Sequence, residues 1–293
     1  MDKSTLAKKA TLLHLNSLAL ADGMRNGSFR SLYKGRGIDF SGVREYMDGD
    51  DVRTIDWNVT ARMCRPFVKQ YDEERDLNVM VVIDASASMK SGSGRKSRLE
   101  IAAECASLLT LASFHNASPI GAVIYDGKIR FNCSPAPGHD QVMLLLSEFE
   151  KVEEYGSGGS SLESALLGCQ RLLKKRTLIM VFSDFRTTSW GQAFGYLCQR
   201  NDVVAVKIAD SMDEHLPEVG SIPFTDPETG IRMVLPTSSS KFRRKWREDN
   251  ESRMVQWSHE CRRRGGIPFV LNTNSDCLRE LTRFFSTRDR QSI

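Results

Sequence analysis

The chain has 293 residues, a formal net charge of +4, and 40% hydrophobic and 27% charged residues. This length and composition fit a globular protein with one large domain and embellishments, or with two smaller domains. The net charge is too small and too dispersed to indicate a nucleic-acid-binding protein, and no apolar run approaches the ~20 residues that span a bilayer. Seven cysteines without a C-x-x-C pair disfavour a zinc site. We expect these cysteines to be reduced thiols and the protein to be cytoplasmic.

Residues 1–76 precede the regular part of the chain. Thr5–Ala21 has the spacing of an amphipathic helix and ends at Asp22-Gly23, and a polar stretch with several glycines follows at 35–57. We expect this N-terminal extension to pack on the main sheet. Its charged residues between Arg44 and Asp56 predict an ion-pair network anchored by Trp57, or alternatively a second binding site.

From residue 77 onward, strand and helix patterns alternate, which predicts an α/β domain over 77–293. Asp126-Gly127 predicts a hairpin at one sheet edge, and D-P-E-T-G at 226–230 predicts a second hairpin within an insertion at about 211–250. We therefore predict a doubly wound, mostly parallel sheet with one antiparallel edge strand. The expected strands are 77–84, 121–125, 129–133, 177–182, 202–208 and 267–271, and the expected helices are 98–115, 140–150, 162–174, 191–199, 251–263 and 277–285.

Oxygen-bearing side chains follow two predicted strands and precede one predicted helix. The carboxyl ends of parallel strands meet at one sheet edge, so we expect these side chains to converge there. Each segment alone has another explanation, because Asp and Ser are common in turns and helix caps. The residues are Asp84, Ser86, Ser88, Asp184 and either Ser160 or Ser161.

Such a set of ligands favours a hard cation. Two carboxylates and three hydroxyls, without sulfur or nitrogen, suit Mg²⁺, with Mn²⁺ or Ca²⁺ as alternatives. Few of these ligands are charged, so the cation would remain electrophilic. It would then accept a carboxylate from another molecule at an open coordination position.

Different stretches of the sequence resemble two known protein families. D-A-S-A-S at 84–88, the hydroxyl before a helix and S-D at 183–184 resemble the metal-ion-dependent adhesion site (MIDAS) of von Willebrand factor A-type domains. G-D-D-V-R-T-I-D-W at 49–57, Y-D-E-E-R-D at 71–76 and D-P-E-T-G at 226–230 resemble the uncharacterised family termed domain of unknown function fifty-eight, commonly encoded beside MoxR-type AAA+ ATPases. The resemblance runs from about Ser28 to about Asp276.

The resemblance implies a ligand set and a partner. Asp84, Ser86 and Ser88 would form the first metal loop, Ser160 the middle ligand and Asp184 the last ligand. Relatives usually have threonine at the middle position, and serine lacks the methyl group that helps to fix the rotamer. The implied function is a chaperone-like, metal-dependent interaction module that binds an acidic residue of a partner and acts with a MoxR-type ATPase in assembly or maturation of a protein complex.

The main alternative is a magnesium-dependent hydrolase or phosphatase at the same site. A haloacid dehalogenase-type phosphatase needs D-x-D, but Ser86 stands where the second aspartate would be. S-G-S-G-R-K-S at 91–97 lacks the order of a P-loop, and these serines lack a G-x-S-x-G context. We therefore expect no enzymatic activity. The basic runs at 241–247 and 262–264 are expected to be solvated helix faces and not a nucleic-acid site.

Overall fold

The computed structural model describes residues 20–21, 24, 38–47, 49–73, 77–155, 161–225 and 232–287. The chain forms two compact units, one of Met1–Gly27 with Leu77–Ile293 and one of Ser28–Asp76. Most of the predicted helix Thr5–Ala21 lies outside the described residues. None of the helices in the described ranges is both long and apolar enough to cross a membrane.

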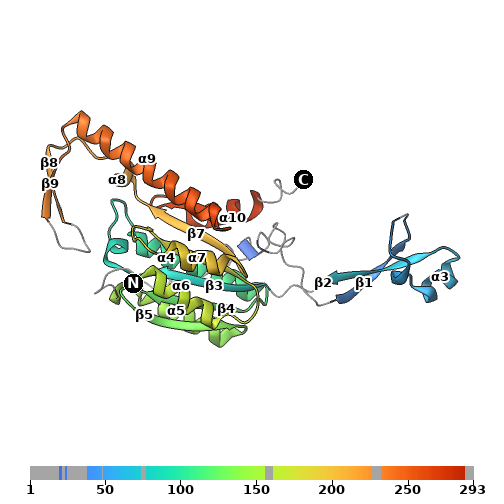
Figure 1. Ribbon diagram of the computed structural model, residues 1–293. Coiled ribbons are helices and arrows are strands. Elements are labelled where there is room, and N and C mark those ends of the chain that lie inside the picture. The colour runs from blue at the N-terminus through green and yellow to red at the C-terminus, as the bar shows by residue number, and fades with distance from the viewer. Residues whose placement is uncertain are drawn as a thin grey trace, which may run out of the picture. The chain divides into compact units, whose positions relative to one another are not determined.

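The larger unit is built on a six-stranded sheet with the order β10-β7-β6-β3-β4-β5 (Figure 1). Only the edge strand β5 runs antiparallel to its neighbour among these strands. The predicted fold class, α/β with a mostly parallel sheet and an antiparallel edge strand, is confirmed. The strands are β3 (Asn78–Asp84), β4 (Ile120–Tyr125), β5 (Ile129–Ala136), β6 (Thr177–Ser183), β7 (Asp202–Ala209) and β10 (Ile267–Asn272).

Helices cover both faces of this sheet, as parallel strands require. On one face, α4 (Arg98–His115) packs against α5 (His139–Glu150) and α10 (Cys277–Thr287). On the other face, α6 (Leu162–Leu172) packs against α7 (Gly191–Cys198), and the core on that side also includes residues of α9 (Ser240–Arg263). The short elements η2 (Ala87–Lys90), η3 (Val152–Glu154) and α8 (Ser211–Glu214) lie in the connections.

The central strands are apolar along their whole length because both of their faces are covered. Every residue of β3, β4 and β6 is buried. Helix α4 begins at a capping box, in which Ser97 accepts from the backbone N–H of Glu100 and Glu100 accepts from that of Ser97. The buried strand β3 and the capped start of α4 hold the two ends of the connection at 85–97.

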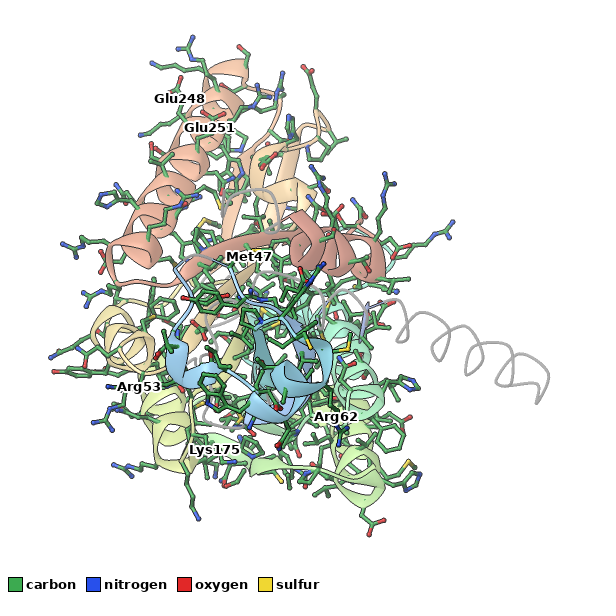
Figure 2. The ribbon with its side chains drawn as sticks, turned by 90° about the vertical axis from the view of Figure 1, so that its right-hand side faces the viewer. Met47, Arg53, Arg62, Lys175, Glu248 and Glu251 are labelled. Atoms are coloured by element: carbon green, nitrogen blue, oxygen red, sulfur yellow. The ribbon has the colours of Figure 1, made fainter. Side chains whose placement is uncertain are left out.

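The insertion forms the predicted hairpin, β8 (Ser221–Thr225) paired with β9 (Arg232–Pro236). Helix α9 begins at Ser240, well before the predicted start at residue 251. Ser239 caps it by accepting from the backbone N–H of Phe242, and the basic run 241–247 forms its first part. Glu248 and Glu251 follow on the same helix (Figure 2).

The smaller unit pairs β1 (Ile38–Glu45) with β2 (Phe67–Glu73) in antiparallel orientation, with η1 (Val52–Thr54) and α3 (Trp57–Met63) between them. Of the predicted ion pairs, Arg44 contacts Asp50 through two hydrogen bonds of 2.7 Å. Asp56 instead caps α3. Trp57, expected to be an apolar anchor, is 68% exposed because it begins the outer side of this short helix. Met47, Arg53 and Arg62 also extend from this unit (Figure 2).

Candidate metal centre

Asp84 and Asp184 lie at the same edge of the sheet. Strands β3 and β6 are parallel neighbours, and their register pairs Ile83 with Phe182, so both strands end at the same level. Asp84 is fully buried and Asp184 is 3% exposed. The sequence prediction that the two strand ends deliver carboxylates to one edge therefore agrees with the geometry.

Hydrogen bonds from nearby serines hold the carboxylate of Asp84 in place. Its Oδ1 accepts from the backbone N–H of Ser86 at 3.0 Å, and its Oδ2 accepts from the hydroxyl of Ser183 at 2.7 Å. Burial, with a further contribution from the charge of Asp184, raises the pKa of Asp84 to about 6. Hydrogen bonds from Ser183 and Ser86 act in the opposite direction and do not offset these effects.

The two predicted serine ligands lie next to each other beside this carboxylate. Their hydroxyl oxygens, Ser86 Oγ and Ser88 Oγ, are 3.2 Å apart, and both residues are buried. The alternation D-A-S-A-S does not continue as a strand, because Ser86 leads directly into η2. The short helix brings Ser88 back toward Ser86, so the two hydroxyls form one oxygen cluster.

A left-handed backbone turn positions Asp184. The next residue, Phe185, has φ of 51°, which is rare for a bulky side chain and requires support from its surroundings. Its N–H donates to the hydroxyl of Ser183, and its ring packs 5.3 Å from that of Trp190 and 5.5 Å from that of Trp257. The aromatic packing thus fixes the direction of the carboxylate that precedes it.

One carboxylate oxygen of Asp184 is buried without a hydrogen bond. Its Oδ1 accepts from the backbone N–H of Arg186 at 3.2 Å, but its Oδ2 has no hydrogen-bond donor. The nearest described cation is Arg186, whose Nε lies 3.5 Å from this oxygen. A buried anionic oxygen in this state is costly, and a cation would stabilise it.

The middle ligand of the prediction, Ser160, lies outside the described residues. Its alternative, Ser161, precedes α6 and uses its hydroxyl locally, since Oγ donates to the Oγ of Ser164 at 2.8 Å. Its backbone N–H donates to the carbonyl oxygen of Asp126. Ser161 is therefore engaged in the first turn of its own helix, which leaves Ser160 as the candidate from this loop.

The ligands that are described fit a hard cation. Two carboxylates and two adjacent hydroxyls offer only oxygen, which suits Mg²⁺. Within the described ranges, no three His, Cys, Asp or Glu side chains gather as a metal cluster. A cation here would therefore depend on these two carboxylates, the serine hydroxyls and water for its coordination.

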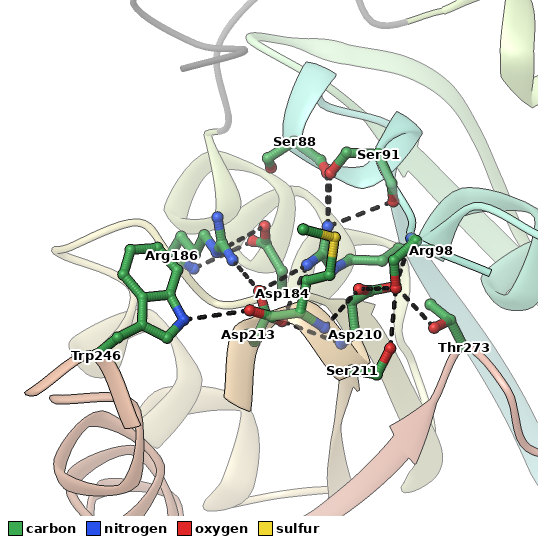
Figure 3. Close-up of polar contacts among 12 residues, drawn as sticks. Ser88, Ser91, Arg98, Asp184, Arg186, Asp210, Ser211, Asp213, Trp246 and Thr273 are labelled. Carbon is green, nitrogen blue, oxygen red and sulfur yellow. Dashed lines mark hydrogen bonds and ion pairs between the residues drawn. The ribbon is translucent and has the colours of Figure 1, made fainter. Parts of the chain in front are cut away.

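A network of arginines and aspartates borders this edge, and no local sequence pattern predicted it (Figure 3). Arg98 is nearly buried, and its Nη2 donates to both carboxylate oxygens of Asp213 at 2.9 Å. Arg186 donates to the Oδ1 of Asp213 at 2.6 Å and so connects Asp213 to Asp184. These residues come from α4, α8 and the loop after β6, which are far apart in the chain.

A second carboxylate organises the adjacent loops. Asp210, after β7, accepts from the backbone N–H groups of Ser93 and Met212 and from the hydroxyl of Thr273. Burial opposes its ionisation, but these hydrogen bonds outweigh burial and lower the pKa of Asp210 to about 2. Asp210 thereby ties the loop at 91–97 to the ends of β7 and β10.

Comparisons with known proteins found similar sequences and similar solved structures. An uncharacterised protein of Mycobacterium bovis, Mb1516, is 26% identical over 299 residues, which cover 100% of this chain and 93% of that protein. BatB from Bacteroides thetaiotaomicron is 15% identical, with a TM-score of 0.45 over 73% of this chain and 99% of its own. The SpRpn10 VWA domain is 9% identical, with a TM-score of 0.41 over 72% of this chain and 95% of its own.

A family profile covers most of the chain, including the end of β1, the whole α/β core up to β9 and much of α9. Its description is "Protein of unknown function DUF58", and it matches residues 42–256. The matched range contains Asp84, Ser86, Ser88 and Asp184, together with the insertion. The chain therefore belongs to the DUF58 family.

Proposed function

We propose that this protein is a non-enzymatic, metal-dependent protein-interaction module. Its cation is Mg²⁺, which prefers oxygen ligands, and it would be held by Asp84, Ser86, Ser88 and Asp184, with Ser160 from the neighbouring loop. When bound, the cation supplies a positive charge at the sheet edge to which a carboxylate of a partner protein binds.

The observation that carries this proposal is the state of the two carboxylates. They are buried at one edge, the charge of Asp184 contributes to the raised pKa of Asp84, and the Oδ2 of Asp184 has no hydrogen-bond donor. A structural role alone would favour an apolar or amide side chain at one of these positions, because burying two neighbouring like charges is destabilising. A divalent cation compensates both charges at once.

The chain's own residues prepare this edge for binding. Ser183 and the backbone of Ser86 orient the carboxylate of Asp84, and the turn at Phe185 orients that of Asp184. Arg98 and Arg186 share Asp213, so this third carboxylate already has two cationic partners. The proposed site thus has two charged ligands and room in its coordination for one more.

The proposal includes a cytoplasmic setting and a MoxR-type AAA+ ATPase as the partner, or a client of that ATPase. Its support is the resemblance of the family-specific stretches at 49–57, 71–76 and 226–230 to proteins encoded beside such ATPases. In this setting the module would help to assemble or mature another protein complex. The acidic residue that completes the coordination would then belong to the ATPase or to its client.

Calorimetry on the purified protein tests the metal site directly. We expect the wild type to bind Mg²⁺ or Mn²⁺, and Asp84→Ala and Asp184→Ala to lose binding while their circular dichroism spectra remain native. Asp140→Ala removes a fully exposed carboxylate on α5 and serves as the matched control. Absence of uptake of Mg²⁺, Mn²⁺ and Ca²⁺ by the wild type would refute the proposal.

A binding assay with a purified MoxR-type ATPase separates the module from an enzyme. We expect retention of the ATPase on the immobilised wild type with Mg²⁺, and loss of retention with chelator or with Asp184→Ala. Phosphoesters and esters should not be turned over under the same conditions. Turnover that depends on Mg²⁺ and disappears in Asp84→Ala would instead establish the hydrolase alternative.

A further inference from the structure

Helix α9 directs one row of residues toward the main sheet. The row is spaced by three or four positions, as one face of a helix requires. Three of its members, Asn250, Trp257 and Cys261, are buried, and the N–H of Trp246 donates to the carbonyl oxygen of Met212 in α8 at 3.2 Å. The row comprises Trp246, Asn250, Arg253, Trp257 and Cys261.

Arg253 is the exception in this inner row. It stands between Asn250 and Trp257 on the inward face, yet its side chain is exposed. It forms no ion pair or hydrogen bond with any residue of the described ranges. An arginine directed to the sheet side of a helix, but left without an acidic partner there, has its five donors available for a ligand.

Lys207 lies on the strand that faces this part of α9. It pairs in register with Ser183, which contacts Asp84, and its Nζ lies 5.4 Å from the ring centre of Trp257. Within the described part of the chain it makes no hydrogen bond or ion pair. Burial lowers the pKa of Lys207. The charges of Asp184 and Asp213 oppose this shift and those of Arg186 and Arg253 add to it, so all four side chains lie near Lys207.

A buried donor and several cations lie together at this place. Trp257 is 6% exposed, and its Nε1–H is buried without an acceptor. The acidic residue nearest to Arg186 in α8, Asp213, already accepts from Arg98 through both of its oxygens. Asp184 and Asp213 also act on Lys207, but each is shared with another arginine, and a divalent cation at Asp84 and Asp184 would offset the charge of Asp184.

We propose that Lys207, Arg253 and Arg186 form a second anion site, which binds another carboxylate of the same partner segment whose first carboxylate completes the metal coordination. The partner is then an acidic polypeptide segment with at least two acidic side chains. This inference rests on the proposed function. A carboxylate fits better than a phosphate, because Asp184 and Asp213 border the site and repel a group carrying about −1.5 to −2 charges more strongly.

The test uses two synthetic hexapeptides with blocked ends, one of six glutamates and one of a single glutamate among five glutamines. The four tryptophans are replaced by 5-fluorotryptophan, and binding is followed by ¹⁹F NMR in saturating Mg²⁺. Trp257 reports on the second anion site, Trp246 on the adjacent part of α9, and Trp57 in the smaller unit is the internal reference.

The variant Arg253→Glu is compared with Arg262→Glu, an equal change of charge at another exposed arginine of α9. In the wild type, hexaglutamate offers six equivalent carboxylates, so its affinity should exceed that of the single-glutamate peptide by about sixfold on statistical grounds alone. A second contact should raise this ratio of affinities well above about tenfold. Arg253→Glu should lose the excess over the statistical factor, and Arg262→Glu should keep it. Lys207→Met, which retains most of the side chain's apolar length, should behave as Arg253→Glu.

The outcomes separate the two proposals. If neither peptide binds in a Mg²⁺-dependent manner, the proposed function fails, and this inference fails with it. If the single-glutamate peptide binds but hexaglutamate gains no more than the statistical factor, or if Arg253→Glu matches Arg262→Glu, only the second anion site is refuted. Equal competition by an oligothymidylate would refute the assignment to an acidic polypeptide.

Discussion

The hydroxyl of Ser183 donates to the carboxylate of Asp84 across two parallel strands, over a distance of 2.7 Å. The same hydroxyl oxygen accepts from the N–H of Phe185, the residue that follows Asp184. One serine thus connects the two carboxylates of the candidate metal centre. The following predictions start from this connection and from its surroundings.

Ser183→Ala should lower the free energy of unfolding by about 1–3 kcal/mol, since it leaves a buried carboxylate oxygen and a buried N–H without this partner. It should also raise the pKa of Asp84 further, because the serine hydrogen bond favours the ionised form. Urea denaturation at pH 7 measures the first effect. Ser238→Ala, at an exposed position after β9, is the control, and equal values for the two variants would contradict the prediction.

The metal-free protein should lose stability through Asp84 as the pH rises. The folded state holds the proton of this carboxyl more tightly than the unfolded state does, so the effect begins near pH 4 and is complete above pH 6. We expect Asp84→Asn to be more stable than the wild type by up to about 3 kcal/mol at pH 8 in chelator. The difference should become small at pH 4, where the folded-state carboxyl is protonated and that of the unfolded state is about half protonated.

Denaturation curves of both proteins from pH 4 to 8 test this difference and cancel the contributions of all other groups. Saturating Mg²⁺ should reverse the order at pH 8, because only the wild type retains the carboxylate that would bind the cation. A stability difference that does not change with pH would show that Asp84 does not titrate in this range.

Asp210 should show the opposite dependence. Its pKa is lowered to about 2, so its contribution to stability is present above about pH 4 and is lost as the pH falls toward 2. Asp210→Asn should cost about 1–2 kcal/mol at pH 7, since it weakens the hydrogen bonds from Ser93 and Thr273. The gap to the wild type should narrow below pH 4, whereas Asp249→Asn, at an exposed position, should be neutral throughout.

Trp246→Phe should loosen the first part of α9 without unfolding the protein. It removes the hydrogen bond to Met212 but keeps an aromatic ring beside Phe242, whose centre lies 6.2 Å from that of Trp246. Loss of about 1 kcal/mol of local stability should speed amide exchange in residues 240–250 about fivefold. Hydrogen-exchange mass spectrometry checks this, with β3 and β6 as unaffected references; unchanged exchange in 240–250 would refute it.

Parts of the fold followed from local sequence patterns. The apolar runs predicted β3 and β6, because strands covered on both faces need no polar positions. Asp126-Gly127 predicted the edge hairpin, and D-P-E-T-G predicted the hairpin of the insertion. The start of α9 could not be predicted in the same way, because the run 241–247 is so polar that periodicity alone did not reveal a helix.

For the candidate site, the sequence by itself determined which strands end in oxygen ligands, since Asp84 and Asp184 directly follow buried apolar runs. Only the tertiary structure decided that β6 lies next to β3, that Ser183 joins the two carboxylates, and that Arg98, Arg186, Lys207 and Arg253 gather around them. The physical reason is that these side chains come from elements up to 155 residues apart in the numbering, from Arg98 to Arg253. Their proximity depends on strand order and helix packing across the whole sheet, which no local pattern encodes.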